Sequence, residues 1–266
     1  MTDLPPTVVF VHGLWLHATS WAPWVERFQS EGYAAIAPGW PGEPETVESA
    51  RRNPQAVARL GVDEVVRHYA TILAPLEGPL VVIGHSVGGQ VAQRLLAEGH
   101  ASAAVAIDPA PIKGVVALAP SALRMVSIAM RNPANLRRAK SLTRRQFRYG
   151  FANAVSQREA DMLYDAWTIP SPMRPLFQTA TANLAPKSAV TVDTRTSSRG
   201  PLLLIAGSED RTIPAPSVKS TRKLYAPSSA VTDYEELPNK GHSLTVDSGW
   251  PVVADTAVRW LKRQLT

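Results

Sequence analysis

The chain has 266 residues, of which 45% are hydrophobic, and a formal net charge of +6. This size suits one large domain or two small ones with a sizeable core. The chain has no cysteine, which excludes disulfides, thiolate metal sites and a cysteine nucleophile. We see no signal-peptide pattern and no apolar run near the roughly 18 residues of a membrane span, so we expect a cytoplasmic protein.

Short β-branched runs alternate with helical patterns over most of the chain. We predict strands at 7–13, 33–39, 79–85, 103–109, 200–208 and 231–238. We predict helices at 20–32, 62–76, 87–99 and 248–265, with Gly32 ending the first of them. Continuously apolar strands separated by helices indicate a parallel sheet that is covered on both faces. Right-handed crossovers then predict a doubly wound α/β fold.

The segment 121–190 interrupts this alternation, because it carries helix signals only. Thr143–Gln146 and Ser156–Glu159 fit the capping box, and prolines at 133, 170, 172 and 175 read as helix stops. We therefore expect a helical cap at 121–190 on a core formed by 1–120 and 191–266. Such a cap would lie over the C-terminal edge of the sheet, where open α/β sheets bind ligands.

The positive charge is concentrated in the predicted cap. Between Ser121 and Asp165 there are nine basic and three acidic residues, a difference of +6 that equals the excess of the whole chain. We favour a solvated helical face, with attraction to an anionic substrate or membrane surface as the alternative. No nucleic-acid-binding motif accompanies the charge, so we expect no nucleic-acid partner.

The stretch Gly84-His85-Ser86-Val87-Gly88 lies between a predicted strand and a predicted helix. A strand that turns at once into a helix strains the residue at the corner, and its neighbours two positions away must be small. The hydroxyl of Ser86 is then raised at a helix N-terminus, which favours developing negative charge. This is the nucleophile elbow, G-x-S-x-G, in its strand–turn–helix context. The spacing fits neither a dinucleotide fingerprint nor a P-loop.

A serine nucleophile needs a base and an acid, which follow it in this motif in the order serine, acid, histidine. Of the six histidines, only His242 lies late enough in the chain. We predict Asp210, after the strand at 200–208, as the acid that orients the imidazole. Glu209 and Asp108 remain alternatives, although we favour Asp108 as a turn carboxylate ahead of Pro109.

The remaining site residues follow from the chemistry of acyl transfer. We predict the backbone N–H groups of Leu14 and Val87 as the oxyanion hole, with His12 as a structural histidine. Three aromatic residues are predicted to wall the pocket, with core packing as the alternative for each: Trp15, Trp40 and Trp167. No group of ligand-type residues has metal-binding spacing, so we expect neither a metal nor a cofactor.

From His12-Gly13 through the elbow to Asp210 and His242, the sequence resembles the α/β-hydrolases. The resemblance covers nearly the whole chain outside the cap and implies a Ser-His-Asp acyl-transfer site beneath a variable cap. His12-Gly13, followed by seven residues and a tryptophan, is similar to plant-type methyl esterases and hydroxynitrile lyases and to cofactor-free haloperoxidases. The first strand begins near Thr7, without the two strands that precede it in many members, as in the methyl-esterase branch. Serine at position 86 argues against the aspartate-dependent dehalogenases and epoxide hydrolases.

These features predict a serine hydrolase that cleaves a carboxylic ester of a small molecule through an acyl-enzyme. One alternative is a hydroxynitrile lyase or perhydrolase on the same triad, with Lys240 as the candidate cation of a lyase. Another is a non-catalytic ligand receptor on the same fold. The sequence leaves the substrate and homo-oligomerisation open.

Overall fold

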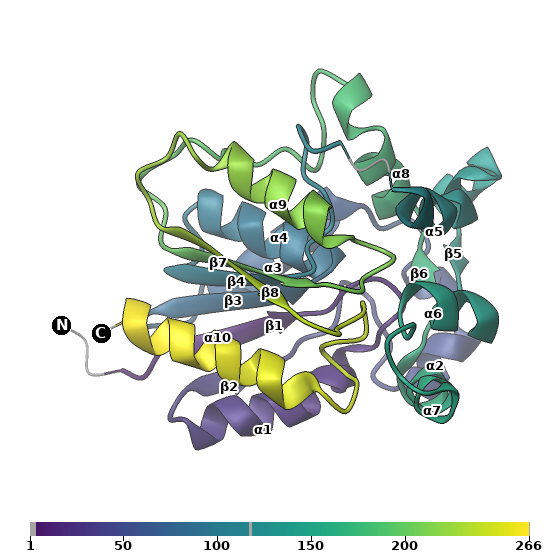
Figure 1. Ribbon diagram of the computed structural model, residues 1–266, viewed down its shortest axis with the longest axis horizontal. Helices are drawn as coiled ribbons and strands as arrows, with labels where there is room; N and C mark the ends of the chain where they lie inside the picture. Colours follow the sequence, from purple (N-terminus) through teal and green to yellow (C-terminus); the bar gives the residue numbers. More distant parts are fainter. Residues whose placement is uncertain (1–3, 117–118, 266) are drawn as a thin grey trace.

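A central sheet of six parallel strands organises the computed structural model, which describes residues 4–116 and 119–265 (Figure 1). The strand order is β2-β1-β3-β4-β7-β8. The strands are β1 (Thr7–Val11), β2 (Ala34–Ile36), β3 (Leu80–His85), β4 (Ala103–Ile107), β7 (Leu202–Gly207) and β8 (Thr232–Leu237). The chain winds outward from β1 to β2 and then returns to β3 on the other side of β1. The loops that follow β1 and β3 therefore meet at the switch point of the sheet, where α/β folds place ligands.

Helices cover both faces of the sheet, as the doubly wound prediction requires (Figure 1). One face packs on α1 (Ala22–Ser30) and α10 (Trp250–Gln264), and the other on α3 (Val62–Leu73), α4 (Val87–Ala97) and α9 (Ala215–Leu224). Side chains alternate between the two faces along β1, because Val8 and Phe10 belong to one buried cluster and Val9 and Val11 to the other. The predicted fold class is confirmed.

Several predicted elements differ in length from the observed ones. A short 3-10 helix, η1 (Ala18–Trp21), precedes α1, and Gly32 ends α1 with a φ of 87°, as predicted. Sequence periodicity missed α2 (Val47–Arg52), a short helix capped by Thr46, and α9, whose exposed positions include Lys219, Arg222 and Lys223. A further 3-10 helix, η2 (Pro54–Ala56), follows α2.

The segment between β4 and β7 forms a cap at one end of the sheet, on the right in Figure 1. Its α-helices are α5 (Pro120–Met130), α6 (Arg144–Gly150), α7 (Gln157–Trp167) and α8 (Arg174–Ala180), and its 3-10 helices are η3 (Pro133–Arg137) and η4 (Ala182–Leu184). The expectation of helix alone is wrong in one respect, because β5 (Ala139–Lys140) pairs antiparallel with β6 (Ser171–Pro172). Strands of two residues are too short for any periodicity to reveal.

The helix boundaries of the cap confirm some sequence signals and correct others. Thr143 and Gln146 form a complete capping box. Ser156 accepts a hydrogen bond from the Glu159 N–H, but the Glu159 carboxylate accepts from the Ser248 N–H instead of closing the box. Pro133 and Pro175 lie in the first turns of η3 and α8, where proline is favoured, and so begin helices rather than end them.

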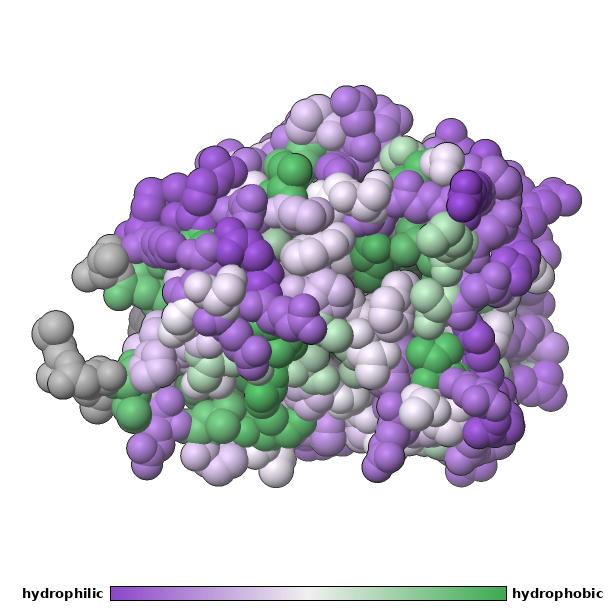
Figure 2. All heavy atoms as spheres, turned by 90° about the horizontal axis from the view of Figure 1, so that it is seen from below, coloured by the Kyte–Doolittle hydropathy of each residue, from purple (hydrophilic) through white to green (hydrophobic). Residues whose placement is uncertain are grey.

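The basic residues of the cap are only partly neutralised. Hydrophilic residues crowd the cap end in Figure 2. Arg144 forms ion pairs with Asp161 and Asp165, whereas Arg124 stacks over the ring of Tyr149 at 4.0 Å. A polar hollow of about 260 Å³ on this cap is lined by three arginines: Arg124, Arg131 and Arg145. Among the described helices, none has both the length and the apolar character to cross a bilayer.

Candidate active site

The predicted elbow adopts the strained geometry that its sequence requires. Ser86, between β3 and α4, has a φ of 56° and a ψ of −119°. A Cβ at Gly84 would lie 2.7 Å from the Gly89 N, and a Cβ at Gly88 would lie 2.7 Å from the His12 O. Neither position can carry a side chain, because the obstructing atoms belong to the backbone. The two glycines therefore allow the corner that presents Ser86 at the start of α4.

The loop after β1 packs directly against this corner. A Cβ at Gly13 would lie 2.7 Å from the Ser86 Cβ and 2.9 Å from the His85 O. Leu14 and Val87 line the same pocket as Ser86. Within the described residues, neither backbone N–H of this pair has a hydrogen-bond acceptor. Two free N–H groups beside a serine hydroxyl are what an oxyanion hole requires.

The structure brings the predicted acid and base together. The Nδ1 of His242 lies 2.6 Å from the Oδ2 of Asp210. The other oxygen of Asp210 accepts hydrogen bonds from the N–H groups of Thr212 at 2.6 Å and Ile213 at 2.8 Å. Glu209 is exposed at the turn surface. Asp210, rather than Glu209, is therefore the carboxylate that is hydrogen-bonded to the imidazole.

The other side of the His242 ring faces the elbow. Its centroid is 4.5 Å from that of His85, the residue before Ser86, and 4.6 Å from that of Phe151 in the cap. The Nε2 of His242 has no hydrogen-bond partner in residues 4–116 and 119–265. A hydrogen bond from Ser86 to this atom is therefore not formed in this structure. Catalytic hydrogen bonds in unliganded enzymes are often long and shorten when substrate binds.

Burial favours the uncharged form of both partners. Burial lowers the pKa of His242 to about 4. Burial also raises the pKa of Asp210 to about 7, although the proximity of Asp108 and the hydrogen bonds from the Ile213 and Thr212 N–H groups act in the opposite direction. At neutral pH the imidazole is thus held neutral, which is the form that a general base needs.

A second buried carboxylate, Asp108, lies beside this pair. Its Oδ1 accepts a hydrogen bond of 2.7 Å from the Gly207 N–H, and its Oδ2 lies 4.0 Å from the Nδ1 of His242. Asp108 also has a positive φ of 40°. The expectation of a simple turn carboxylate is wrong, because Asp108 reaches across from β4 to the end of β7 and to the imidazole.

Ser86 opens into a cavity of about 210 Å³ between the sheet and the cap. Aliphatic side chains of α5 and α8 form much of its wall, among them Leu123, Met125 and Leu176. The polar members of the lining, besides Ser86, are Thr179, Asn183, Thr212 and Ser217. No charged side chain belongs to the described lining, so the cavity suits an uncharged apolar group.

Of the three tryptophans predicted to wall the pocket, Trp15 alone lines it. Trp40 is buried below the loop after β1, where its Nε1 donates to the His12 O at 3.1 Å. Trp167 holds the cap to the core, since its carbonyl accepts from the His17 N–H at 3.1 Å. Trp40 belongs to a buried hydrophobic cluster and Trp167 is partly buried against it, which agrees with core packing, the alternative that the sequence had left open.

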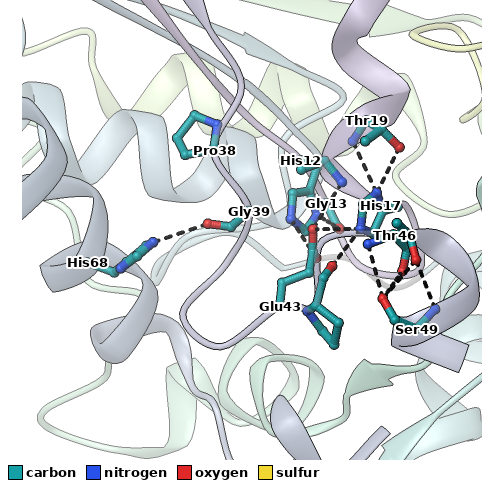
Figure 3. A network of polar contacts seen from close by, with 12 residues as sticks. His12, Gly13, His17, Thr19, Pro38, Gly39, Glu43, Thr46, Ser49 and His68 are labelled. Carbon is teal, nitrogen blue, oxygen red and sulfur yellow. Dashed lines mark hydrogen bonds and ion pairs between the residues drawn. The ribbon is translucent and has the colours of Figure 1, made fainter. Parts of the chain in front are cut away.

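A buried glutamate, Glu43, braces the loop after β1 (Figure 3). It lies 3.1 Å from the Nε2 of His12 and accepts a hydrogen bond of 3.1 Å from the Ala18 N–H. Burial opposes its ionisation, but the imidazoles of His12 and His17 outweigh burial and lower the pKa of Glu43. His12 is structural, as predicted. The role of Glu43 has no sequence signal, because it lies in an irregular loop between Gly42 and Pro44.

Folding also brings three potential metal-ligating groups together, which sequence spacing does not reveal. One donor atom each from His85, Asp108 and His242 lies within 4.8 Å of the others. The hydrogen bond between His242 and Asp210 already uses the Nδ1 of this imidazole. We therefore treat the three residues as part of the acid–base network.

Comparisons with known proteins agree with this architecture. The model of the alpha/beta hydrolase family matches residues 8–256. A search of curated proteins found no match.

Similar solved structures show the same fold. A monoacylglycerol lipase from Paleococcus ferrophilus has a TM-score of 0.65 at 20% identity, over 96% of this chain and 93% of the lipase. An extracellular alpha/beta-hydrolase from a Paenibacillus species has a TM-score of 0.70 at 19% identity, over 96% and 98% of the two chains. A methylesterase from Arabidopsis has a TM-score of 0.64 at 13% identity, over 96% and 98%. The family match spans nearly the whole sequence, and the chain belongs to the alpha/beta hydrolase family.

Proposed function

We propose that this protein is a serine hydrolase that cleaves a carboxylic ester of a small molecule. The observation that carries the proposal is the pairing of His242 with Asp210 next to the elbow residue His85, together with a strained Ser86 that lines an apolar cavity. Structures of similar fold include a lipase and a methylesterase, whose names describe ester cleavage.

The proposed reaction has two steps, acylation of Ser86 and then hydrolysis of the acyl-enzyme. The Nε2 of His242 takes the proton of Ser86 as its oxygen attacks the ester carbonyl. The N–H groups of Leu14 and Val87 bind the oxyanion of the tetrahedral intermediate. His242 then gives the proton to the leaving alcohol, and the acyl group stays on Ser86. In the second step His242 activates water, which releases the acid and restores the hydroxyl.

The cavity favours an ester with an uncharged aliphatic group. Its described lining is mostly aliphatic and includes no arginine. Arg174 pairs with Glu64 at 3.3 Å, and Arg124 lines the separate polar hollow of the cap. We therefore propose that the basic cap surface does not select the group held next to Ser86.

A hydroxynitrile lyase would need a cation beside the substrate, and the sequence offers Lys240 as its candidate. The ammonium of Lys240 lies 3.9 Å from Asp247, outside the lining of the cavity. No observation favours the lyase over the esterase. Release of cyanide from mandelonitrile by the purified protein would reverse this preference.

Turnover of p-nitrophenyl esters tests the proposal directly. We expect Ser86→Ala and His242→Ala each to lower kcat by about 10⁴-fold or more, while both variants keep a cooperative thermal unfolding transition. Ser217→Ala is a matched control, because Ser217 is a second buried serine in the same lining. It should retain turnover. Full activity of Ser86→Ala, or no turnover by the wild type over a broad ester panel, would end the proposal.

A further inference from the structure

Two buried carboxylates face one imidazole in this site. Asp210 accepts the hydrogen bond from the Nδ1 of His242, and the Oδ2 of Asp108 lies 4.0 Å from the same atom. Both acids and the imidazole are buried. Serine acyl transfer as described above needs one acid, so the mechanism leaves Asp108 unused.

The surroundings of Asp108 indicate which form it takes. Its Oδ1 is satisfied by the Gly207 N–H, but its Oδ2 has no donor among residues 4–116 and 119–265. The Oδ2 atoms of Asp108 and Asp210 lie 4.0 Å and 2.6 Å from the same Nδ1 of His242, so the two carboxylates are close neighbours. Two adjacent carboxylates without a donor between them would repel each other in a medium of low dielectric. A proton on Asp108 turns this repulsion into a hydrogen bond to Asp210.

We propose that Asp108 is a positioning residue that carries a proton at rest, donates it as a hydrogen bond to Asp210, and acts as a reserve acid for His242. The effect of Asp108 on catalysis rests on the proposed function. The hydrogen bond between Asp108 and Asp210 does not rest on it. When Asp210 is ionised, the pair holds one negative charge, which is sufficient to stabilise the imidazolium. Burial and the proximity of Asp210 both raise the pKa of Asp108 well above its usual range.

The reserve role becomes visible when Asp210 is neutralised. In Asp210→Asn, burial still raises the pKa of Asp108, but the repulsion from a neighbouring carboxylate is gone, so Asp108 loses its proton at a lower pH than in the wild type. The resulting carboxylate can then accept the Nδ1–H of His242 after a small movement that closes the 4.0 Å separation. The titratable groups around Asp108 in this variant are His242, His85 and Tyr234.

A double-mutant cycle with Asp108→Asn and Asp210→Asn tests this inference. The amide introduced by Asp108→Asn keeps a donor toward Asp210, so we expect this variant alone to lower kcat/KM only about 3- to 10-fold. Asp210→Asn should lose about 10- to 100-fold, less than the loss of about 10⁴ typical when the only triad acid is neutralised. The double variant should show that full loss. In Asp210→Asn, kcat/KM should also rise with pH as Asp108 ionises, and this rise should vanish in the double variant.

Asp233→Asn in the Asp210→Asn background is the matched control, because Asp233 pairs with Trp260 and not with the imidazole. It should leave the residual activity and its pH dependence intact. The inference is overturned if Asp210→Asn is as inactive as the double variant.

A second measurement does not depend on turnover. The downfield NMR signal of the His242 Nδ1 proton should persist in Asp210→Asn and disappear in the double variant. Its loss in Asp210→Asn alone would overturn the inference even if ester cleavage by Ser86 holds. Its persistence would support the pairing even if no ester is cleaved.

Discussion

The contact between Gly13 and the elbow allows the effect of one added methyl group to be calculated. In Gly13→Ala, the new Cβ would lie 2.7 Å from the Ser86 Cβ, where carbon atoms normally approach to about 3.5–4.0 Å. The loop or the serine must therefore move by about 0.8–1.3 Å. A misplacement of about 1 Å in a catalytic arrangement costs roughly 100-fold in rate. We expect kcat/KM for an activated ester to fall about 100-fold, with a loss of about 1–3 kcal/mol in unfolding free energy.

Kinetics on p-nitrophenyl esters and urea unfolding of the same samples separate the two effects. Gly99→Ala is the control, because nothing lies within 4 Å of its Cβ position and its φ of 82° imposes strain alone. We expect Gly99→Ala to lose stability by about 1–2 kcal/mol while its kcat/KM stays at the wild-type value. Wild-type kcat/KM in folded Gly13→Ala would refute the assignment of this loop to the oxyanion hole.

Three other predictions concern the elbow, the brace and the cavity. Gly88→Ala should lose about 3 kcal/mol or more and lower the Tm by roughly 6–12 °C, because its Cβ would meet the backbone oxygens of Val11 and His12; an unchanged melting curve would contradict the close approach. Glu43→Gln should lower the unfolding free energy by about 1–3 kcal/mol at pH 7. Because the pKa of Glu43 is lowered, its contribution is complete above its ordinary value of 4.5 and is lost as the pH falls through the lower folded value. The difference in urea unfolding should therefore shrink progressively as the pH is lowered below 4.5. A difference that does not change with pH would count against a stabilising contact between the Glu43 carboxylate and the two imidazoles. In a series of p-nitrophenyl esters, each methylene added up to the length of the cavity should raise kcat/KM about fourfold, from about 0.8 kcal/mol of burial, and a flat series would contradict an apolar acyl site.

Local sequence features were sufficient to predict the fold and the nucleophile elbow. The apolar strands predicted a parallel sheet, since each buried strand carries its own signal in a few consecutive residues. The glycines at 84 and 88 and the strand–helix context likewise predicted the strained corner that the structure has at Ser86. The order of residues along the chain then indicated His242 and favoured Asp210 over Glu209 and Asp108, and the structure places His242 and Asp210 2.6 Å apart.

Features that depend on contacts distant in sequence could not be predicted in this way. The reach of Asp108 to His242 depends on the pairing of β4 with β7, across the whole inserted cap. The partners of Trp40 and Trp167 are backbone carbonyl and N–H groups, which carry no sequence signature. The brace formed by Glu43 likewise depends on a loop conformation without periodicity.

Covalent labelling with a fluorophosphonate, followed by mass spectrometry of the proteolytic peptides, tests the central claim most directly. The account predicts one adduct, on Ser86, that forms quickly in folded wild type and much more slowly in His242→Ala. An adduct on another residue, or folded protein that does not label at all, would contradict the assignment of Ser86 as the nucleophile.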